Sequence, residues 1–345
     1  MHSELQKLEI CITNHKERKD IQREAFEKKI ENLDEDSAII LMDFKENIKL
    51  GKCNREVSSV FYSASQRTFF SVAVILRGKK FKYFDFISED LTHDASFVIR
   101  CLNTLFNLPE WQSLSIKRIS FWSDGAKHFR NFELIRYQIS LIESRMVQSV
   151  DTNYFIEYHG KSYCDSHFSR ISRILKTFEQ SSSEPIDSTS KLINLLNDKL
   201  GNNIGYNGAK RLRLDMSFKL LEVPFFPRVE NYETCNFKGL KLYYSFEVVN
   251  NTTLFASITH GDIKGKIINV KLLQAKRDKP KKPPKISPQL NLSIQFKDNM
   301  WRTELKRSEI QGRQLPNIHP MIIQDVLQTG SAQVQFDPMD IDTTN

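Results

Sequence analysis

The sequence predicts an α/β fold in which a mixed five-stranded sheet is flanked by helices and followed by a small β-rich module. Apolar runs such as residues 38–44 are typical of buried strands. Segments with helical periodicity separate the later strands, and the one at residues 93–108 stops before Pro109, as a helix should. Aromatic and β-branched residues gather again from residue 218, which favours a second group of strands.

The order of elements defines the first domain. Apolar side chains at irregular helical spacing in residues 1–34 indicate one or two amphipathic helices. Strand patterns follow at residues 38–44, 58–63, 68–76, 79–87, 115–122 and 154–158. Helical patterns fall at residues 93–108, 127–147 and 165–178. Strands that precede the first crossover helix therefore form a meander, and two further strand-helix units follow.

Changes in composition set the predicted domain boundaries. The predicted parts are a helical segment at 1–34, the α/β domain at 35–180, a linker with short helices at 181–217, the β-rich module at 218–275, and a basic, largely disordered tail at 276–345. That tail begins with a lysine- and proline-rich run, residues 276–285, which fits a nuclear-import signal, a phosphate contact or a solvated linker.

Composition narrows the class of protein. The 345-residue chain has a net charge of +8, which favours a polyanionic partner over a merely lysine-rich surface. Its five cysteines are scattered and form no Cys-x-x-Cys pair, so a reducing compartment is expected. No apolar run approaches the ~18 residues of a membrane span. We therefore expect a soluble, nuclear protein that binds DNA and no membrane, and homo-oligomerisation stays open.

Two aspartates suggest a metal site. Asp43 ends one apolar strand pattern, and Asp124 ends another about eighty residues later. A helical crossover between these strands favours parallel neighbours, whose carboxyl ends meet at one edge of the sheet. Carboxylates brought this close repel one another unless a divalent cation binds them, and hard oxygen ligands select Mg²⁺ or Mn²⁺. A two-metal site of this kind carries out phosphoryl transfer in nucleases.

Such a site needs a third acid near the helix that follows the fifth strand. Asp165 is the candidate that this topology favours, and Glu157 is the alternative. An aspartate at a helix start is also a common N-cap, so Asp165 has a plain structural interpretation as well. His167 is expected to be an exposed histidine in the first turn of this helix. The alternative is that it acts as an outer-shell metal ligand or as a general base.

Three short blocks, residues 42–48, 122–129 and 159–165, together resemble transposase-derived proteins with a ribonuclease H-like core. The resemblance covers about residues 15–180. It implies a ribonuclease H-like fold and a metal-binding, catalytic triad of Asp43, Asp124 and Asp165, with His159 and Lys161 near the DNA. No zinc finger or helix-turn-helix precedes the core, so a truncated or domesticated copy is the alternative.

Basic side chains accompany the acids. The candidate DNA-binding residues are Lys45, Lys127, His128, Arg130, His159 and Lys161. Such groups position a phosphate backbone without reading its sequence. The function predicted first is therefore a transposase-like nuclease or strand transferase, and the alternative is an inactive DNA- or chromatin-binding protein. A cellular ribonuclease or exonuclease is less favoured, because Lys45 occupies the position where an Asp-x-Glu motif would have glutamate.

Overall fold

The fold is described from a computed structural model. It covers residues 2–51, 65–156, 162–182, 184–201, 216–225 and 227–277. Thr13–Lys279 form one compact unit, whereas the first turns of the N-terminal helix, up to Ile12, belong to a second unit. In the part of the chain that is described, no helix is both long and apolar enough to span a membrane.

Helices alternate with strands through the first half of the compact unit, and strands dominate its second half. The helices are α1 (His2–Glu31), α3 (Ala95–Phe106), α4 (Pro109–Gln112), α5 (Phe132–Glu143), α6 (Tyr163–Ser181) and α7 (Thr189–Gly201). The strands are β1 (Ser37–Lys49), β2 (Gln66–Leu76), β3 (Lys80–Ser88), β4 (Arg118–Ser123), β5 (Ser149–Tyr154), β6 (Met216–Glu222), β7 (Asn231–Asn236), β8 (Ser245–Asn250), β9 (Thr253–Ser257), β10 (Lys266–Asn269) and β11 (Lys271–Lys276).

Within the described residues, the main sheet is mixed and has nine strands in the order β10-β9-β8-β5-β4-β1-β2-β3-β6. At its centre β1 is antiparallel to β2 and parallel to β4, and β4 is parallel to β5. The crossover from β3 to β4 runs through α3, and α5 links β4 to β5, as parallel pairing requires. The predicted parallel pairing of the first strand with the strand after the crossover is therefore confirmed.

The predicted five-stranded sheet is wrong in number, because segments expected in a separate β-rich module extend the main sheet. β8 pairs with the outer edge of β5, β9 and β10 follow it, and β6 pairs with β3 at the other edge. β7 and β11 form a two-stranded sheet. An uncovered sheet edge leaves backbone N–H and C=O groups unpaired, and the added strands satisfy them. The alternation of side chains gives no sign of which edge a strand will join.

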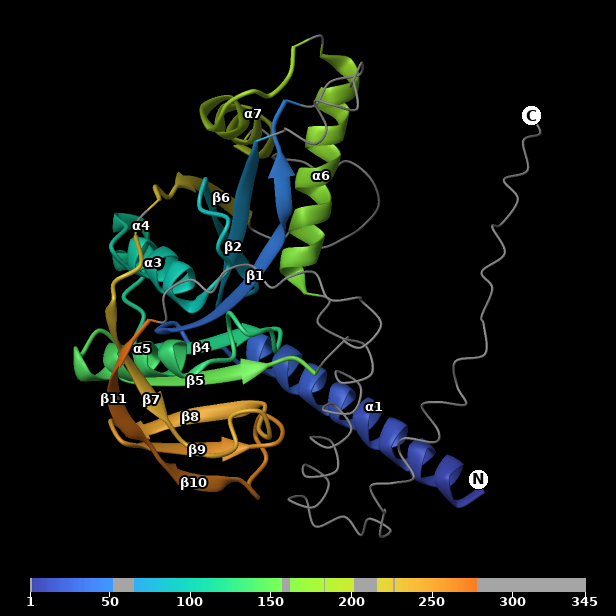
Figure 1. Cartoon of the computed structure of the whole chain (residues 1–345), viewed down its shortest axis with the longest axis vertical. Helices are drawn as coiled ribbons and strands as arrows, with labels where there is room; N and C mark the ends of the chain where they lie inside the picture. Colours follow the sequence, from blue (N-terminus) through green and yellow to red (C-terminus); the bar gives the residue numbers. More distant parts are fainter. Residues whose placement is uncertain are drawn as a thin grey trace. The chain divides into compact units, whose positions relative to one another are not determined.

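Helices cover both faces of the central strands, and the alternation of side chains along β1 explains why. Ile40 and Met42 face one core with α3 and α5, whereas Ile39 and Leu41 face the opposite core with α1, α6 and α7. Figure 1 shows α6 beside β1 and β2, with α3 and α4 on the other side. Each fully buried side chain of this size contributes about 1.5–3 kcal/mol. A strand with two apolar faces is thus the centre of a three-layer fold.

Several predicted boundaries move, and the strand predicted at 38–44 extends to Lys49. The segment predicted as strand 154–158 is β5, Ser149–Tyr154, and the predicted helix 127–147 shortens to α5, Phe132–Glu143. Asn131 ends the loop before α5 and accepts a hydrogen bond from the Leu134 backbone N–H at 2.8 Å. Asp94 is likewise the N-cap of α3, because its Oδ1 accepts a hydrogen bond from the Phe97 backbone N–H at 2.8 Å. The predicted strand at 58–63 lies outside the described residues.

Candidate functional site

Asp43 and Asp124 stand opposite each other on neighbouring parallel strands. The last paired residues of β1 and β4 are Leu41 and Trp122. Asp43 lies two residues beyond Leu41 on β1, and Asp124 lies two residues beyond Trp122, directly after β4. Extending the register therefore brings the two aspartates opposite each other just beyond the β1–β4 pairing, although β1 itself continues past Asp43 to Lys49 and stays paired with β2. This is the relation that the sequence predicts.

Asp165 approaches the same edge on the first turn of α6. The neighbouring Cys164 Sγ donates to the carbonyl oxygen of Leu41 at 3.8 Å, which holds this turn against β1. α6 begins at Tyr163, not at Asp165 as predicted, and Ser162 is its N-cap. Asp165 instead closes a capping box, accepting the Ser162 backbone N–H on Oδ2 at 2.7 Å. Its carboxylate therefore has a structural role already, whatever else it does.

The electrostatics link the three acids. Burial, and then the charges of Asp124 and Asp165, together raise the pKa of Asp43 to about 7. The hydrogen bond from the Phe44 backbone N–H acts in the opposite direction. Loss of solvent also raises the pKa of Asp124, the Ala126 N–H opposes this, and Asp165 adds to it. The Asp124 side chain is exposed, so solvent screens its charge more than that of the half-buried Asp43. The three carboxylates repel one another across this edge.

Asp43 and Asp124 fit a divalent cation by placement and by charge, since hard oxygen ligands with raised pKa values gain most from a nearby cation. Asp165 fits less directly, because its Oδ2 is held by Ser162. Among the described residues, no three His, Cys, Asp or Glu side chains are gathered closely enough to hold an ion. The alternative acid Glu157, together with His159 and Lys161, lies outside the described residues.

Two of the predicted DNA-binding lysines lie beside the carboxylates. Lys45 follows Asp43 by two residues on β1, so it shares the same face of the strand. Lys127 is exposed in the loop that follows Asp124. Both positions suit contact with a phosphate backbone that approaches this edge.

His128 sits against aromatic rings. Its ring centroid is 4.8 Å from that of Phe44 and 6.5 Å from that of His93. Burial, and then the neighbouring His93, lower the pKa of His128 to about 4. The imidazole is therefore neutral at physiological pH and has no charge to offer a phosphate, although it can still donate a hydrogen bond.

Arg130 is buried and serves the fold. Its guanidinium donates to the carbonyl oxygen of Leu240 at 3.1 Å and to that of Tyr243. It also lies over the rings of Tyr154 and Tyr244, at 5.0 and 4.8 Å from their centroids. The residue predicted to contact DNA thus ties the loop after Asp124 to the segment before β8.

A family model covers this region. The model described as "Domain of unknown function (DUF8701)" matches residues 22–255, more than half of the chain. The chain belongs to this family. The DUF8701 match runs from α1 into β9 and contains Asp43, Asp124 and Asp165. No curated protein matches the chain.

Within the DUF8701 region, sequence reasoning missed a buried polar chain beside the carboxylates. His167 is buried, not exposed as expected, and its Nε2 lies 2.7 Å from Asp85 Oδ2. The other oxygen of Asp85 accepts the Ser71 hydroxyl at 2.7 Å. The signal that could have revealed it is an aspartate between Phe84 and Phe86 in an apolar strand, since a buried carboxylate requires a partner.

Proposed function

We propose that the protein is a metal-dependent nuclease or strand transferase that acts on DNA phosphodiesters through Asp43, Asp124 and Asp165. The observation that carries this proposal is the opposition of Asp43 and Asp124 just beyond the last paired residues of two parallel strands, with the pKa of Asp43 raised to about 7. Uncompensated carboxylates destabilise the fold unless a cation joins them. Their placement side by side is what a metal-dependent site requires.

The strand order supports a ribonuclease H-like core of the kind found in transposase-derived proteins. Five neighbouring strands run in the order β3-β2-β1-β4-β5, with β2 antiparallel to both of its neighbours and β1, β4 and β5 parallel. In a core of this type the acids belong on the first strand, at the end of the fourth strand and on a helix after the fifth. Asp43, Asp124 and Asp165 occupy those elements. β6 and β8–β10 are then additions at the two edges.

In this reaction the acidic and the basic side chains of the site would have separate roles. A bound Mg²⁺ or Mn²⁺ pair supplies charge stabilisation to the attacking and leaving oxygens of a phosphodiester. Asp43 and Asp124 would hold these ions. The orientation of the two carboxylates is fixed by hydrogen bonds from the backbone N–H groups of Phe44 and Ala126, at 2.8 and 3.0 Å. Lys45 and Lys127 would position the DNA backbone through phosphate contacts.

One observation favours a second function, a catalytically inactive DNA- or chromatin-binding protein of transposase origin. Asp165 Oδ2 is engaged by the Ser162 N–H at 2.7 Å, and the three acids are not drawn into one ligand group within the described residues. A domesticated protein can keep the fold and the basic surface while the third acid serves only as a helix cap. Both functions predict DNA binding, but only the first predicts cleavage.

Cleavage of supercoiled plasmid DNA tests the proposal. The full chain should nick plasmid in MgCl₂ or MnCl₂ and not in EDTA, and Asp124→Asn should reduce the rate by about 10³-fold or more, because it removes a metal ligand while keeping the side-chain volume. Asp20→Asn is the matched control, since it makes the same change at an exposed position on α1. Equal cleavage by the Asp124→Asn and wild-type proteins would contradict the catalytic assignment.

DNA affinity separates the two functions. If neither metal supports cleavage but the protein binds DNA, and binding weakens steeply with salt because phosphate contacts release counterions, the second function is favoured. Lys127→Ala should then weaken binding evenly across sequences and reduce the salt slope by about one. Binding that does not change between low and high salt would contradict both functions.

A further inference from the structure

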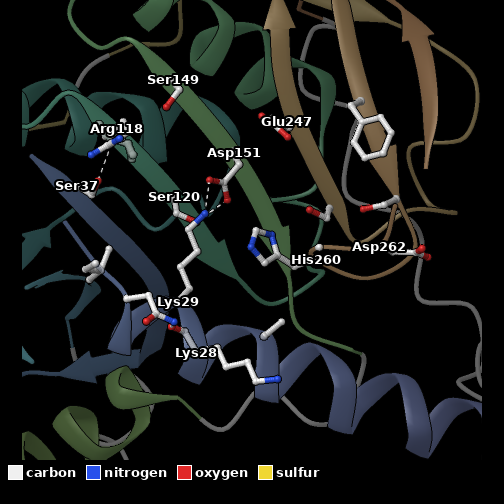
Figure 2. A pocket seen from close by; sticks show the side chains of 18 of the residues that line it. Lys28, Lys29, Ser37, Arg118, Ser120, Ser149, Asp151, Glu247, His260 and Asp262 are labelled. Atoms are coloured by element: carbon white, nitrogen blue, oxygen red, sulfur yellow. Dashed lines mark hydrogen bonds and ion pairs between the residues drawn. The ribbon is translucent and has the colours of Figure 1, made fainter. Parts of the chain in front are cut away.

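A cavity of about 970 Å³ lies between α1 and the strands β4, β5, β8 and β9 (Figure 2). Its lining includes Ser37 and Arg118, the first residues of β1 and β4. Asp43 lies in the middle of β1 and Asp124 directly after β4, each six residues from these first residues, and neither lines the cavity, so the cavity is separate from the carboxylate site. A cavity of this volume can hold a small molecule or a long side chain of a partner protein.

The cavity forms where the added strands leave one face of the sheet uncovered. Asp151 on β5 pairs with Glu247 on β8, which pairs with Phe255 on β9, so these three side chains form a row. Phe246 and Leu254, which alternate with this row, point into the core on the other face. Of the described helices, α1 alone contributes to the lining. One wall is therefore helical and the floor is sheet.

Hydrogen bonds fix the polar groups on the floor. Asp151 Oδ2 forms an ion pair with Lys29 Nζ at 2.7 Å, and its Oδ1 accepts the Ser120 hydroxyl and the Asn153 amide. Because a carboxylate only accepts, the Asn153 NH₂ group must face Asp151, and its carbonyl Oδ1 must face His260 Nδ1 at 3.0 Å. Nδ1 of His260 therefore carries the proton, and Nε2 presents its lone pair.

His260 extends toward the cavity between Lys29 and the strands (Figure 2). Burial lowers the pKa of His260, against the opposing charge of Asp151, and Lys29 lowers it further. The ring is therefore neutral at physiological pH, and Nε2 is an acceptor. Within the described part of the chain, no protein group donates to it.

The charged groups that remain after internal pairing are also acceptors. Each basic residue of the lining is already in an ion pair: Lys28 with Glu24, Lys29 with Asp151, and Arg118 with Asp34. Glu247 is in no ion pair with any described residue, and its carboxylate is exposed along the lining. The net charge of +8 favours a polyanionic partner elsewhere on the chain, but a cavity with surplus acceptors repels a polyanion. Its ligand must donate hydrogen bonds and carry positive charge.

We propose that this cavity binds an organic cation, a primary ammonium group on an aliphatic chain, with His260 Nε2 and the Glu247 carboxylate as its acceptors. Ile21, Ala25 and Phe255 supply the apolar and aromatic surface for the aliphatic part. A free polyamine and a lysine side chain of a partner protein share this chemistry. The inference does not depend on the nuclease activity, because none of the three catalytic acids lines the cavity.

Isothermal titration calorimetry with spermidine tests the site in the full-length protein. Glu247→Gln and His260→Phe should each weaken binding by about tenfold, the effect of losing one charged or well-placed hydrogen bond in a partly enclosed site. Glu222→Gln is the matched control, because it removes the same charge from an exposed strand end outside the cavity, and it should change affinity by less than about twofold. Since Glu247 is exposed, its replacement should not disturb folding.

A second ligand identifies the source of the ammonium group. If Nα-acetyl-lysine amide binds as tightly as spermidine, the site takes a lysine side chain, and if spermidine binds much more tightly, it takes a free polyamine. The Nε-acetylated lysine, which lacks the charge, should not bind in either case. No binding of spermidine and of the lysine amide overturns the proposal. An equal loss of spermidine affinity in Glu247→Gln and Glu222→Gln overturns it as well, because binding would then follow net charge alone.

Discussion

Asp43 and Asp85 occupy one row of the sheet and have opposite surroundings. Asp43 pairs with Ser71 on β2, and Ser71 pairs with Asp85 on β3, so the two carboxylates lie two strands apart. Asp85 is fully buried, but the Ser71 hydroxyl and His167 Nε2 bind its two oxygens. Asp43 is half-buried, accepts the Phe44 N–H, and faces two further acids. The two aspartates therefore differ in compensation more than in burial, and the proposed site is the one whose carboxylate lacks compensation.

One helix accounts for both environments. The first turns of α6 bring His167 to Asp85 and Asp165 to the edge where Asp43 lies, and the two residues of α6 are only two positions apart. The His167–Asp85 bond thus stabilises the docking of the same helix that adds repulsion at Asp43. In this arrangement, a satisfied polar pair offsets part of the energy stored at the carboxylate site.

The largest expected effect concerns the stability of the metal-free protein. The folded state holds the proton of Asp43 up to about pH 7, whereas the unfolded chain loses it near 3.8. Stability therefore falls as pH rises through this window, and the loss is complete above pH 7. The Asp43→Asn variant has no carboxyl group to ionise and so avoids this loss of stability. Urea unfolding in EDTA at pH 8 should therefore show the variant to be more stable than the wild-type protein, by at most about 4 kcal/mol.

The comparison of wild type with Asp43→Asn at several pH values isolates this effect from other titrating groups. The difference in unfolding free energy should shrink to well under about 1 kcal/mol at pH 4, where Asp43 is protonated in the folded state and about half protonated in the unfolded chain. Asp20→Asn, on the exposed side of α1, should show no comparable trend. A difference that is the same at pH 4 and pH 8 would mean that Asp43 is compensated after all.

The opposite result is expected for the compensated carboxylate. His167→Leu leaves Asp85 Oδ2 buried without its partner, and removing one member of a buried pair should destabilise the protein by about 3 kcal/mol. Urea unfolding at pH 7 measures this loss. A change of less than about 0.5 kcal/mol would show that the pair does not hold α6, and it would remove the contrast between the two aspartates.

Particular residues show what the sequence could predict. The crossover helix and the apolar strands predicted the parallel neighbours that bring Asp43 opposite Asp124, because chain topology allows few alternatives. The Asp85–His167 bond joins residues 82 positions apart, and nothing local to either residue indicates the partner. His260 was missed for the same reason, since its environment exists only after β8 and β9 extend the sheet. Local patterns predict elements, whereas pairings between distant polar groups depend on the assembled fold.

Magnesium should convert the uncompensated site into a compensated one. At a free Mg²⁺ concentration about a hundredfold above its dissociation constant, a cation bound only by the folded state stabilises the protein by about 2.7 kcal/mol. Urea unfolding of the wild-type protein at pH 8, with and without MgCl₂, measures this gain. Asp43→Asn should lose most of it because one carboxylate ligand is gone, whereas Asp20→Asn should keep it. If Mg²⁺ stabilises Asp43→Asn as much as wild type, the ion binds elsewhere, and the repulsion at Asp43 serves some purpose other than holding a metal.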